Sequence, residues 1–123
     1  MSSQKTILTV DDSRTIRDML KVTLSAAGYE VMQAEDGVEA LERLAGSKPA
    51  AIVTDINMPR MDGFELIERV RQGGEHKTTP ILVLTTESEP DRKARAKEAG
   101  ATGWIVKPFN PEKLLEALRR VGA

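Results

Sequence analysis

Asp55 is the residue of this sequence whose position most needs a chemical explanation. It closes a short apolar run and opens the segment "DINMPRMDG", which has neither helical nor strand periodicity. A charged carboxylate at the mouth of a buried strand is costly unless something compensates the charge. Asp55 could begin a turn, as aspartate often does, or it could belong to a functional site.

Polar residues also end three other apolar runs that have the character of strands. These are Asp11 and Asp12 after residues 6–10, Thr85 at the end of residues 81–85, and Lys107 after residues 103–106. Each has an ordinary explanation: a helix N-cap for an aspartate, a β-branched strand residue for Thr85, a surface side chain for Lys107. Parallel strands bring their carboxyl ends to the same side of a sheet, and ligands bind at that side. If each ordinary explanation held, these polar residues would therefore meet at one sheet edge only by coincidence.

Two periodicities alternate along the chain and predict the elements that position these residues. The predicted strands are residues 6–10, 29–34, 50–55, 81–85 and 103–106, and the helices are 13–27, 37–45, a segment marked by 64–70 that ends at 72–74, 90–99, and one beginning at 111. Five strand–helix pairs in strict order predict a doubly wound α/β domain with a parallel sheet and helices on both faces. The continuously apolar runs "AIVT" and "ILVL" are typical of central strands.

Three segments carry predictions of their own. The first helix is expected to bury an apolar face of Ile16, Met19, Leu20, Leu24 and Ala27. The fourth helix has only Ala94, Ala96 and Ala99 at apolar positions, so it should dock weakly. Its basic residues are either solvated or contact an acidic partner: Arg92, Lys93, Arg95 and Lys97. The single histidine, His76, is expected to be solvated in a surface loop over residues 73–79.

The composition excludes several classes of function. The 123 residues suit one domain, and 40% hydrophobic with 30% charged residues is the balance of a soluble globular chain. With 18 basic and 19 acidic side chains the net charge is −1, which argues against a domain that binds a nucleic-acid backbone. The absence of cysteine excludes disulfides, thiolate metal sites and cysteine nucleophiles and suits a reducing cytoplasm. We expect a cytoplasmic protein without a signal peptide or membrane span.

Electrostatics favours a divalent cation among the strand ends. Two carboxylates about 5 Å apart repel by roughly 3 kcal/mol at an effective dielectric constant of 20. Lys107 alone cannot neutralise three of them, whereas Mg²⁺ binds carboxylates together with phosphate oxygens. With no cysteine and no Walker glycine loop in the sequence, Asp55 is the best-placed nucleophile for a phosphoryl group.

Four motifs, "VDDS", "TDINMPRMDG", "LTT" and "KPF", now stand in order along the chain. With them the sequence resembles the receiver domain of bacterial two-component response regulators over its whole length, 1–123, and most of all the stand-alone chemotaxis type. The resemblance implies a flavodoxin-like (βα)5 fold with strand order 2-1-3-4-5. It also implies a phosphorylation-dependent signalling switch that is not an enzyme in the usual sense, although it catalyses its own phosphoryl transfer and autodephosphorylation.

The resemblance assigns a role to each site residue. Asp55 is the phosphoacceptor, and Mg²⁺ is held by Asp11, Asp12, Asp55 and the backbone carbonyl of Asn57. Lys107 pairs with the acyl phosphate, and the Lys107–Pro108 peptide bond is cis. Thr85 and Trp104 form the switch. Asn57 and Glu87 tune a rapid dephosphorylation. Trp104 is bulkier than the usual aromatic residue there, and Thr86 stands where a small residue is common.

The implied partners are a sensor histidine kinase, with a chemotaxis kinase favoured, and an output protein such as the flagellar motor switch. The protein would act as a monomer, without binding nucleic acid or membrane. A receiver module of a larger transcriptional regulator and a phosphate sink for a chemotaxis kinase remain alternatives. A flavodoxin-like electron carrier is disfavoured because Asp11 and Asp12 would repel its cofactor phosphate. A haloacid-dehalogenase-type phosphatase normally carries its nucleophile in a D-x-D pattern after the first strand.

Overall fold

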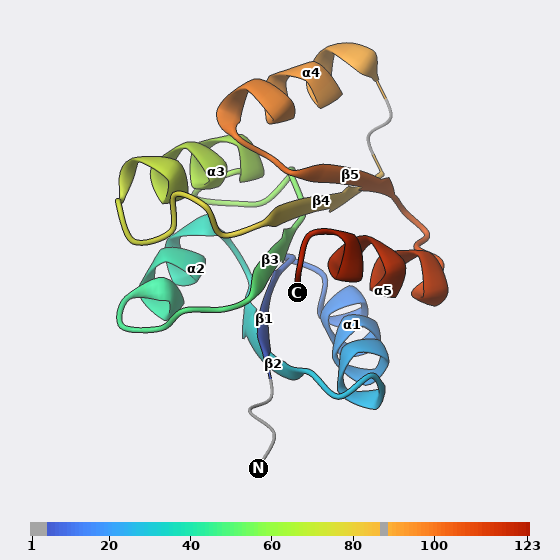
Figure 1. Cartoon of the computed structure of the whole chain (residues 1–123). Coiled ribbons are helices and arrows are strands. Elements are labelled where there is room, and N and C mark those ends of the chain that lie inside the picture. The colour runs from blue at the N-terminus through green and yellow to red at the C-terminus, as the bar shows by residue number, and fades with distance from the viewer. Residues whose placement is uncertain (1–4, 87–88) are drawn as a thin grey trace.

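Strands and helices alternate without interruption in the computed structural model, which describes residues 5–86 and 89–123 (Figure 1). The elements are β1 Thr6–Val10, α1 Arg14–Ala26, β2 Glu30–Ala34, α2 Gly37–Leu44, β3 Ala51–Thr54, α3 Gly63–Gln72, β4 Ile81–Thr85, α4 Pro90–Ala99, β5 Gly103–Val106 and α5 Pro111–Arg120. These agree with the predicted segments to within one or two residues at each end. None of the helices in these described ranges has both the length and the apolar character that a membrane crossing needs.

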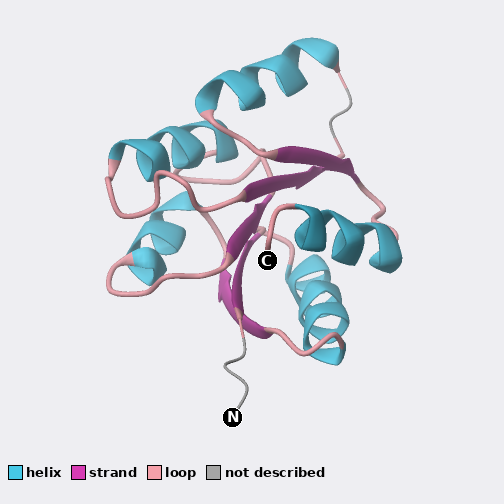
Figure 2. Ribbon diagram, viewed as in Figure 1, coloured by secondary structure: helices cyan, strands magenta, loops and turns pink. Residues whose placement is uncertain are grey.

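The strands form one parallel sheet in the order β2-β1-β3-β4-β5, as predicted. β1 lies between β2 and β3, with Leu8 opposite Met32 on one side and Ile52 on the other. The chain moves outward from β1 to β2 and then back across to β3, β4 and β5. Because each crossover is right-handed, this reversal puts α1 on one face and α2, α3 and α4 on the other. Helix α5 returns to the face of α1 (Figures 1 and 2).

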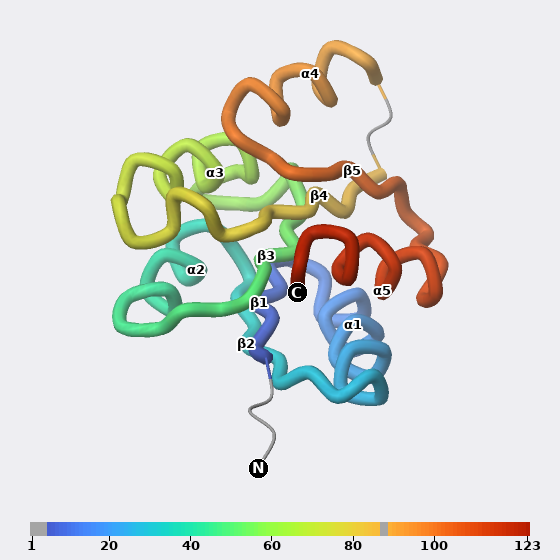
Figure 3. Tube along the Cα trace, in the orientation of Figure 1, coloured from blue at the N-terminus to red at the C-terminus, as the bar shows by residue number. Residues whose placement is uncertain are grey.

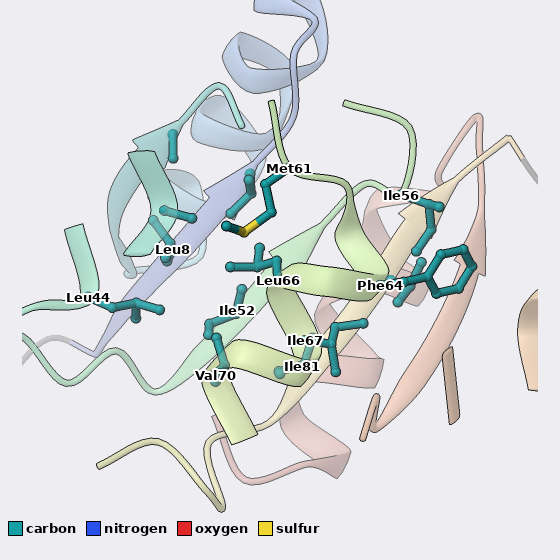
Figure 4. Packing of buried hydrophobic residues seen from close by; sticks show 14 of the residues in the cluster. Leu8, Leu44, Ile52, Ile56, Met61, Phe64, Leu66, Ile67, Val70 and Ile81 are labelled. Atoms are coloured by element: carbon teal, nitrogen blue, oxygen red, sulfur yellow. The ribbon is translucent and has the colours of Figure 1, made fainter. Parts of the chain in front are cut away.

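Side chains of the central strands point alternately into two cores. Ile52 packs with the residues beneath α2, α3 and α4, whereas Ala51 and Val53 pack with α1 and α5. β4 alternates in the same way, and all five of its residues are buried. Figure 4 shows the larger core, where Leu66, Ile67 and Val70 of α3 lie over Ile52 and Ile81. Burial on both faces explains why these strands are continuously apolar.

Helix α1 departs from its predicted apolar face. Leu20 and Leu24 are buried and Ile16 is half-buried, but Met19 is 46% exposed and Ala27 is exposed. The buried stripe is therefore narrower than predicted. Met19 precedes Leu20 by one position, which rotates it by about 100° around the helix and toward solvent.

Helix α4 docks through fewer apolar contacts than its neighbours, as predicted, but also through contacts that the sequence did not suggest. Ala96 is its one fully buried residue, and Ala94, expected on the apolar face, is exposed. The guanidinium carbons of Arg92 and Arg95 instead lie 5.3 and 4.2 Å from the centre of the Phe64 ring at the start of α3. Such cation–π contacts hold a helix without requiring large apolar side chains.

His76 is buried, with 8% of its surface exposed, so its expected solvation is wrong. The reason is Arg71 at the end of α3. Its guanidinium donates hydrogen bonds to the carbonyls of His76 at 2.9 Å, Thr79 at 2.7 Å and Gly100 at 2.8 Å. These bonds fix the α3–β4 loop against the domain, and His76 is folded inward with it.

Candidate active site

Three carboxylates meet where β1 and β3 end. Val10 pairs with Thr54 in the register of these strands, so Asp11 and Asp55 leave the sheet side by side. The Asp55 backbone N–H donates to the Val10 carbonyl at 2.9 Å, which fixes this arrangement. One oxygen from each of Asp11, Asp12 and Asp55 lies within 4.8 Å of the others. Asp11 and Asp55 are buried and Asp12 is exposed, so the cluster opens to solvent on one side.

The Lys107 ammonium bridges the two buried carboxylates. Its Nζ donates to Asp11 Oδ2 at 2.7 Å and to Asp55 Oδ2 at 2.9 Å. Burial of the ammonium acts to lower the pKa of Lys107, but the hydrogen bonds and charges of Asp11 and Asp55 outweigh burial and raise that pKa. Lys107 is therefore positively charged at neutral pH.

The remaining carboxylate oxygens accept backbone hydrogen bonds. Asp11 Oδ1 accepts from Ser13 N–H at 2.9 Å, and Asp55 Oδ1 accepts from Ile56 N–H at 2.7 Å. Burial nevertheless raises the pKa of Asp11, and the bonds from Lys107 and Ser13 offset this only in part. Three carboxylates and one ammonium leave a net charge of −2 in the fully ionised cluster. Such a cluster can take up a divalent cation.

The loop after β3 is folded tightly back on the site. Gly63 N–H donates to the Ile56 carbonyl at 2.8 Å. A Cβ at Gly63 would overlap the Asp55 carbonyl oxygen and lie 2.9 Å from Ile56 Cα, so this position requires glycine for space. Two residues after Asp55, the exposed Asn57 accepts a hydrogen bond on Oδ1 from Arg92 Nη2 of α4 at 3.2 Å. No pattern in the sequence signals this contact, because the two residues are 35 positions apart.

Thr85 and Lys107 are neighbours through the backbone. Thr85 is fully buried at the end of β4, and its carbonyl accepts from Lys107 N–H at 2.8 Å. The Lys107–Pro108 peptide bond is cis, as the resemblance implied. Trp104 is half-buried on β5, opposite Val83, and lines a hollow of about 430 Å³ between β5 and α4. Glu87 lies outside the described residues.

Residues 7–119 match the family model described as the response regulator receiver domain. The chain belongs to this family. Receiver domains are phosphorylation-dependent switches of two-component signalling, and they typically bind Mg²⁺ at an acidic pocket.

Several known proteins resemble this receiver domain closely. Chemotaxis protein CheY1 of Helicobacter pylori is 45% identical over 117 residues, which cover 94% of each chain. The crystal structure of Vibrio cholerae chemotaxis protein CheY4 has a TM-score of 0.93 and 51% identity, covering 97% of this chain and 99% of that one. Response regulator MprA of a Mycobacterium species is 43% identical over 113 residues, 92% of this chain but 48% of MprA.

The acidic pocket of this receiver domain fits a magnesium ion. Its donor set is three carboxylates, the ligand type that Mg²⁺ prefers, and the exposed Asp12 leaves one side open for water ligands. The net charge of −2 supplies an electrostatic reason for a divalent cation to bind. The sequence had placed all three of these aspartates at one sheet edge, and the structure brings them together with Lys107.

Proposed function

We propose that Asp55 of this receiver domain accepts a phosphoryl group from the phosphohistidine of a sensor histidine kinase in a Mg²⁺-dependent reaction. The whole chain, residues 1–123, would act as one receiver domain. The observation that carries the proposal is the pair of hydrogen bonds from Lys107 Nζ to Asp11 and Asp55 within the three-carboxylate cluster. This arrangement supports a nucleophilic role for Asp55, because its carboxylate lies beside a fixed positive charge and within a cluster that can take up a divalent cation.

The transfer exchanges one bond to phosphorus for another. A carboxylate oxygen of Asp55 attacks the phosphorus atom, and the bond between phosphorus and the imidazole nitrogen breaks with its electron pair left on the imidazole. The acyl phosphate on Asp55 is later hydrolysed when water attacks phosphorus and the carboxylate leaves. Lys107 is placed to stabilise the negative charge of the phosphoryl oxygens, because its ammonium is already held against Asp55. Asp55 itself is positioned by Ile56 N–H and the β1–β3 pairing.

Asp11, Asp12 and Asp55, together with the Asn57 backbone carbonyl, would hold the Mg²⁺ ion. When bound, the ion supplies the positive charge that neutralises phosphoryl oxygens during transfer. Thr85 would then donate its hydroxyl to the phosphoryl group, and Trp104 would respond on β5. We expect the phosphorylated state to be short-lived, with Asn57 and Glu87 tuning its hydrolysis.

The output surface is proposed to be the face made by α4, β5 and α5. The residues that line the hollow between α4 and β5 include the basic Lys93 and Lys97 and the apolar Ala96 and Trp104. A second hollow, of about 490 Å³, continues between β5 and α5 and includes Lys113 and Arg120 in its lining. Basic side chains around a partly apolar hollow suit an acidic partner segment. We propose that this partner is a protein, that the receiver acts as a cytoplasmic monomer, and that nucleic acid and membrane are not its targets.

Chemotaxis is the signalling process that the comparisons favour. Two relatives that this chain covers almost end to end are named as chemotaxis proteins. A chemotaxis kinase would therefore be the phosphodonor, and the flagellar motor switch the output partner. The alternative, a receiver module of a larger transcriptional regulator, is favoured by the match to MprA, of which the aligned segment is about half. Binding of the phosphorylated chain to a motor-switch segment, compared with binding to a DNA-binding output domain, separates the two.

Labelling with a small phosphodonor tests the acceptor. Acetyl phosphate with MgCl₂ should add one phosphoryl group to the intact protein, and the Asp55→Asn variant should gain none. Asp18→Asn is the matched control, because it removes an exposed carboxylate on α1, outside the cluster. Labelling of Asp55→Asn at wild-type level would refute the assignment. A phosphorylated state that lasted for many hours in Mg²⁺ would contradict the expected rapid hydrolysis.

Trp104 gives a readout of the switch, since it is the single tryptophan of the chain. Adding Mg²⁺ with beryllofluoride, a phosphoryl mimic, should change Trp104 fluorescence in the wild type and leave Asp55→Asn unchanged. Equal responses of the two proteins would show that the signal does not arise from the acceptor site.

A further inference from the structure

Arg60 has an unusual backbone conformation in the loop between β3 and α3. Its φ of 65° is the one positive value at a non-glycine position within residues 5–86 and 89–123. Met61 N–H donates to the Pro59 carbonyl at 2.7 Å, so Arg60 is the central residue of a tight three-residue turn. Glycine or asparagine would adopt this conformation at lower cost. The choice of arginine therefore suggests a role for its side chain.

The Arg60 side chain reaches across to the start of α2. Its Nε donates to Asp36 Oδ2 at 2.7 Å and its Nη2 donates to Asp36 Oδ1 at 3.1 Å, a two-point contact. The Asp36 side chain is only 3% exposed and also caps α2 by accepting from Glu39 N–H at 2.8 Å. Because Asp36 is fixed by the helix that it caps, it is a rigid anchor for the arginine.

A second contact ties the same two segments together. Gly37 N–H donates to the Met61 carbonyl at 3.3 Å. A Cβ at Gly37 would lie 2.7 Å from Met61 Cγ, so glycine lets the Met61 side chain pack into the core against the helix start. Figure 4 shows Met61 pointing into this core from the loop. The loop is therefore anchored at Arg60 and Met61, immediately before α3 begins.

The anchored residues are close along the chain to the magnesium-ligand positions. Arg60 is three positions after Asn57, and the exposed Asn57 and Pro59 lie between the anchor and the buried Ile56. Eight residues, 55–62, connect β3 to α3, whose path Figure 3 traces, so the connection is short and a displacement at one point is passed to its neighbours. A shift of the Arg60 turn would thus move the Asn57 carbonyl relative to Asp11 and Asp55.

We propose that Arg60 is a positioning residue for the metal site: its ion pair with Asp36 holds the β3–α3 loop so that the Asn57 carbonyl faces the acidic cluster. The inference rests on the proposed function, because it takes the Asn57 carbonyl as a Mg²⁺ ligand. Arg60 acts through the loop backbone and does not itself contact the ion. This role explains why the loop keeps an arginine at a backbone position that favours glycine.

The test separates metal affinity from stability with the Arg60→Gly variant. Glycine relieves the positive φ, so the thermal midpoint should change little, while Mg²⁺ binding measured by calorimetry with MgCl₂ should weaken about tenfold, as for loss of an outer-shell contact. Asp36→Asn, which keeps an oxygen to cap α2, should weaken binding similarly. The double variant should bind no more weakly than Arg60→Gly alone. Arg69→Ala, which removes an exposed arginine paired with Glu65, is the control and should bind normally.

Two further readouts make the result decisive. Excess Mg²⁺ should restore the labelling rate of Arg60→Gly, because only affinity is lost. In metal-free protein the Gly37 amide should exchange faster in Arg60→Gly than in wild type. Equal Mg²⁺ affinity of wild type and Arg60→Gly would overturn the proposal. Absence of Mg²⁺ binding by the wild type would refute the proposed metal chemistry. The role of Arg60 in holding the loop would then be judged by amide exchange alone, and equal Gly37 exchange in wild type and Arg60→Gly would overturn it.

Discussion

Asp12→Asn should make the metal-free protein more stable while it weakens the metal site. Asp12 is the exposed member of the three-carboxylate cluster, and Lys107 hydrogen-bonds to the other two members. Without a metal ion, Asp12 therefore adds a third negative charge to a group that has one compensating ammonium. Replacing its carboxylate by an amide of the same shape removes this charge with little change in packing.

The size of the effect follows from the geometry. At 4.8 Å, the separation within which the cluster oxygens lie, two unit charges repel by about 3.5 kcal/mol at a dielectric constant of 20 and about 0.9 kcal/mol at that of water. The exposure of Asp12 favours the lower figure. Asp12 is repelled by Asp11 and by Asp55, and these two repulsions are partly offset by attraction to the Lys107 ammonium that bridges the same two carboxylates, which leaves about 1 kcal/mol. We therefore expect the metal-free protein to gain about 1 kcal/mol of stability from Asp12→Asn when measured in EDTA.

Magnesium should reverse the order of stability. A ligand at one hundred times its dissociation constant stabilises the folded state by about 2.7 kcal/mol. Wild type gains this amount, whereas Asp12→Asn, which lacks one ligand carboxylate, gains little at the same concentration. The wild type should then be more stable than the variant by roughly 2 kcal/mol, the difference between the two effects.

Urea denaturation at pH 7 in 0.1 M salt measures the stability of wild type and Asp12→Asn under two conditions, with EDTA and with saturating MgCl₂. Asp18→Asn serves as control and should shift neither curve appreciably, since it lies on an exposed face of α1. A variant that is less stable than wild type in EDTA would show that some other interaction of Asp12 outweighs its repulsion by Asp11 and Asp55. Equal stabilisation of both proteins by Mg²⁺ would show that Asp12 is not a ligand.

Two more outcomes follow from the loop that carries Asp55. The hydrogen bond from the Arg60 guanidinium lowers the pKa of Asp36 from its ordinary value of 3.8. The ionised Asp36 carboxylate therefore stabilises the folded protein above pH 3.8, and this stabilisation is lost as the pH falls through the lower pKa that Asp36 has in the folded state. Wild type should exceed Asp36→Asn by about 1.5 kcal/mol at pH 5–7 and by progressively less below pH 3.8 in urea titrations; a pH-independent gap would contradict this. Gly63→Ala should cost about 2 kcal/mol because its Cβ overlaps the Asp55 carbonyl, whereas Gly73→Ala, with only ordinary contacts, should be nearly neutral; equal thermal midpoints would refute the steric argument.

The sequence predicted those parts of the molecule that depend on periodicity and topology. Continuous apolar runs identified the buried strands, and the parallel order of the strands brought Asp11, Asp55 and Lys107 to one edge. No knowledge of side-chain contacts was required, because the carboxyl ends of parallel strands share an edge in any doubly wound fold. The cluster could therefore be predicted before its distances were known.

The errors and omissions concern contacts between segments that have no common period. His76 was expected in solvent because its loop is polar, but Arg71 draws that loop inward through three backbone carbonyls of the loop. The Arg60–Asp36 pair joins residues 24 positions apart, and the Arg92–Asn57 bond joins residues 35 apart. A single arginine on a surface loop or helix has many possible partners. Only the folded geometry selects one.

Helix α4 contacts the surroundings of the proposed acceptor Asp55 by a route that is separate from the proposed switch residues Thr85 and Trp104. The contacts of its arginines fall on Asn57, two residues after Asp55, and on Phe64, which follows the glycine packed against the Asp55 carbonyl. Asn57 belongs to the loop that leaves β3, and Phe64 belongs to the first turn of α3, which directly follows that loop. Since α4 buries only Ala96 fully, these polar and cation–π contacts are a large share of what holds it. If Asp55 is phosphorylated as proposed, a change in the β3–α3 loop would therefore alter the docking of α4 directly, and the basic side chains that α4 contributes to the proposed partner surface would move with it.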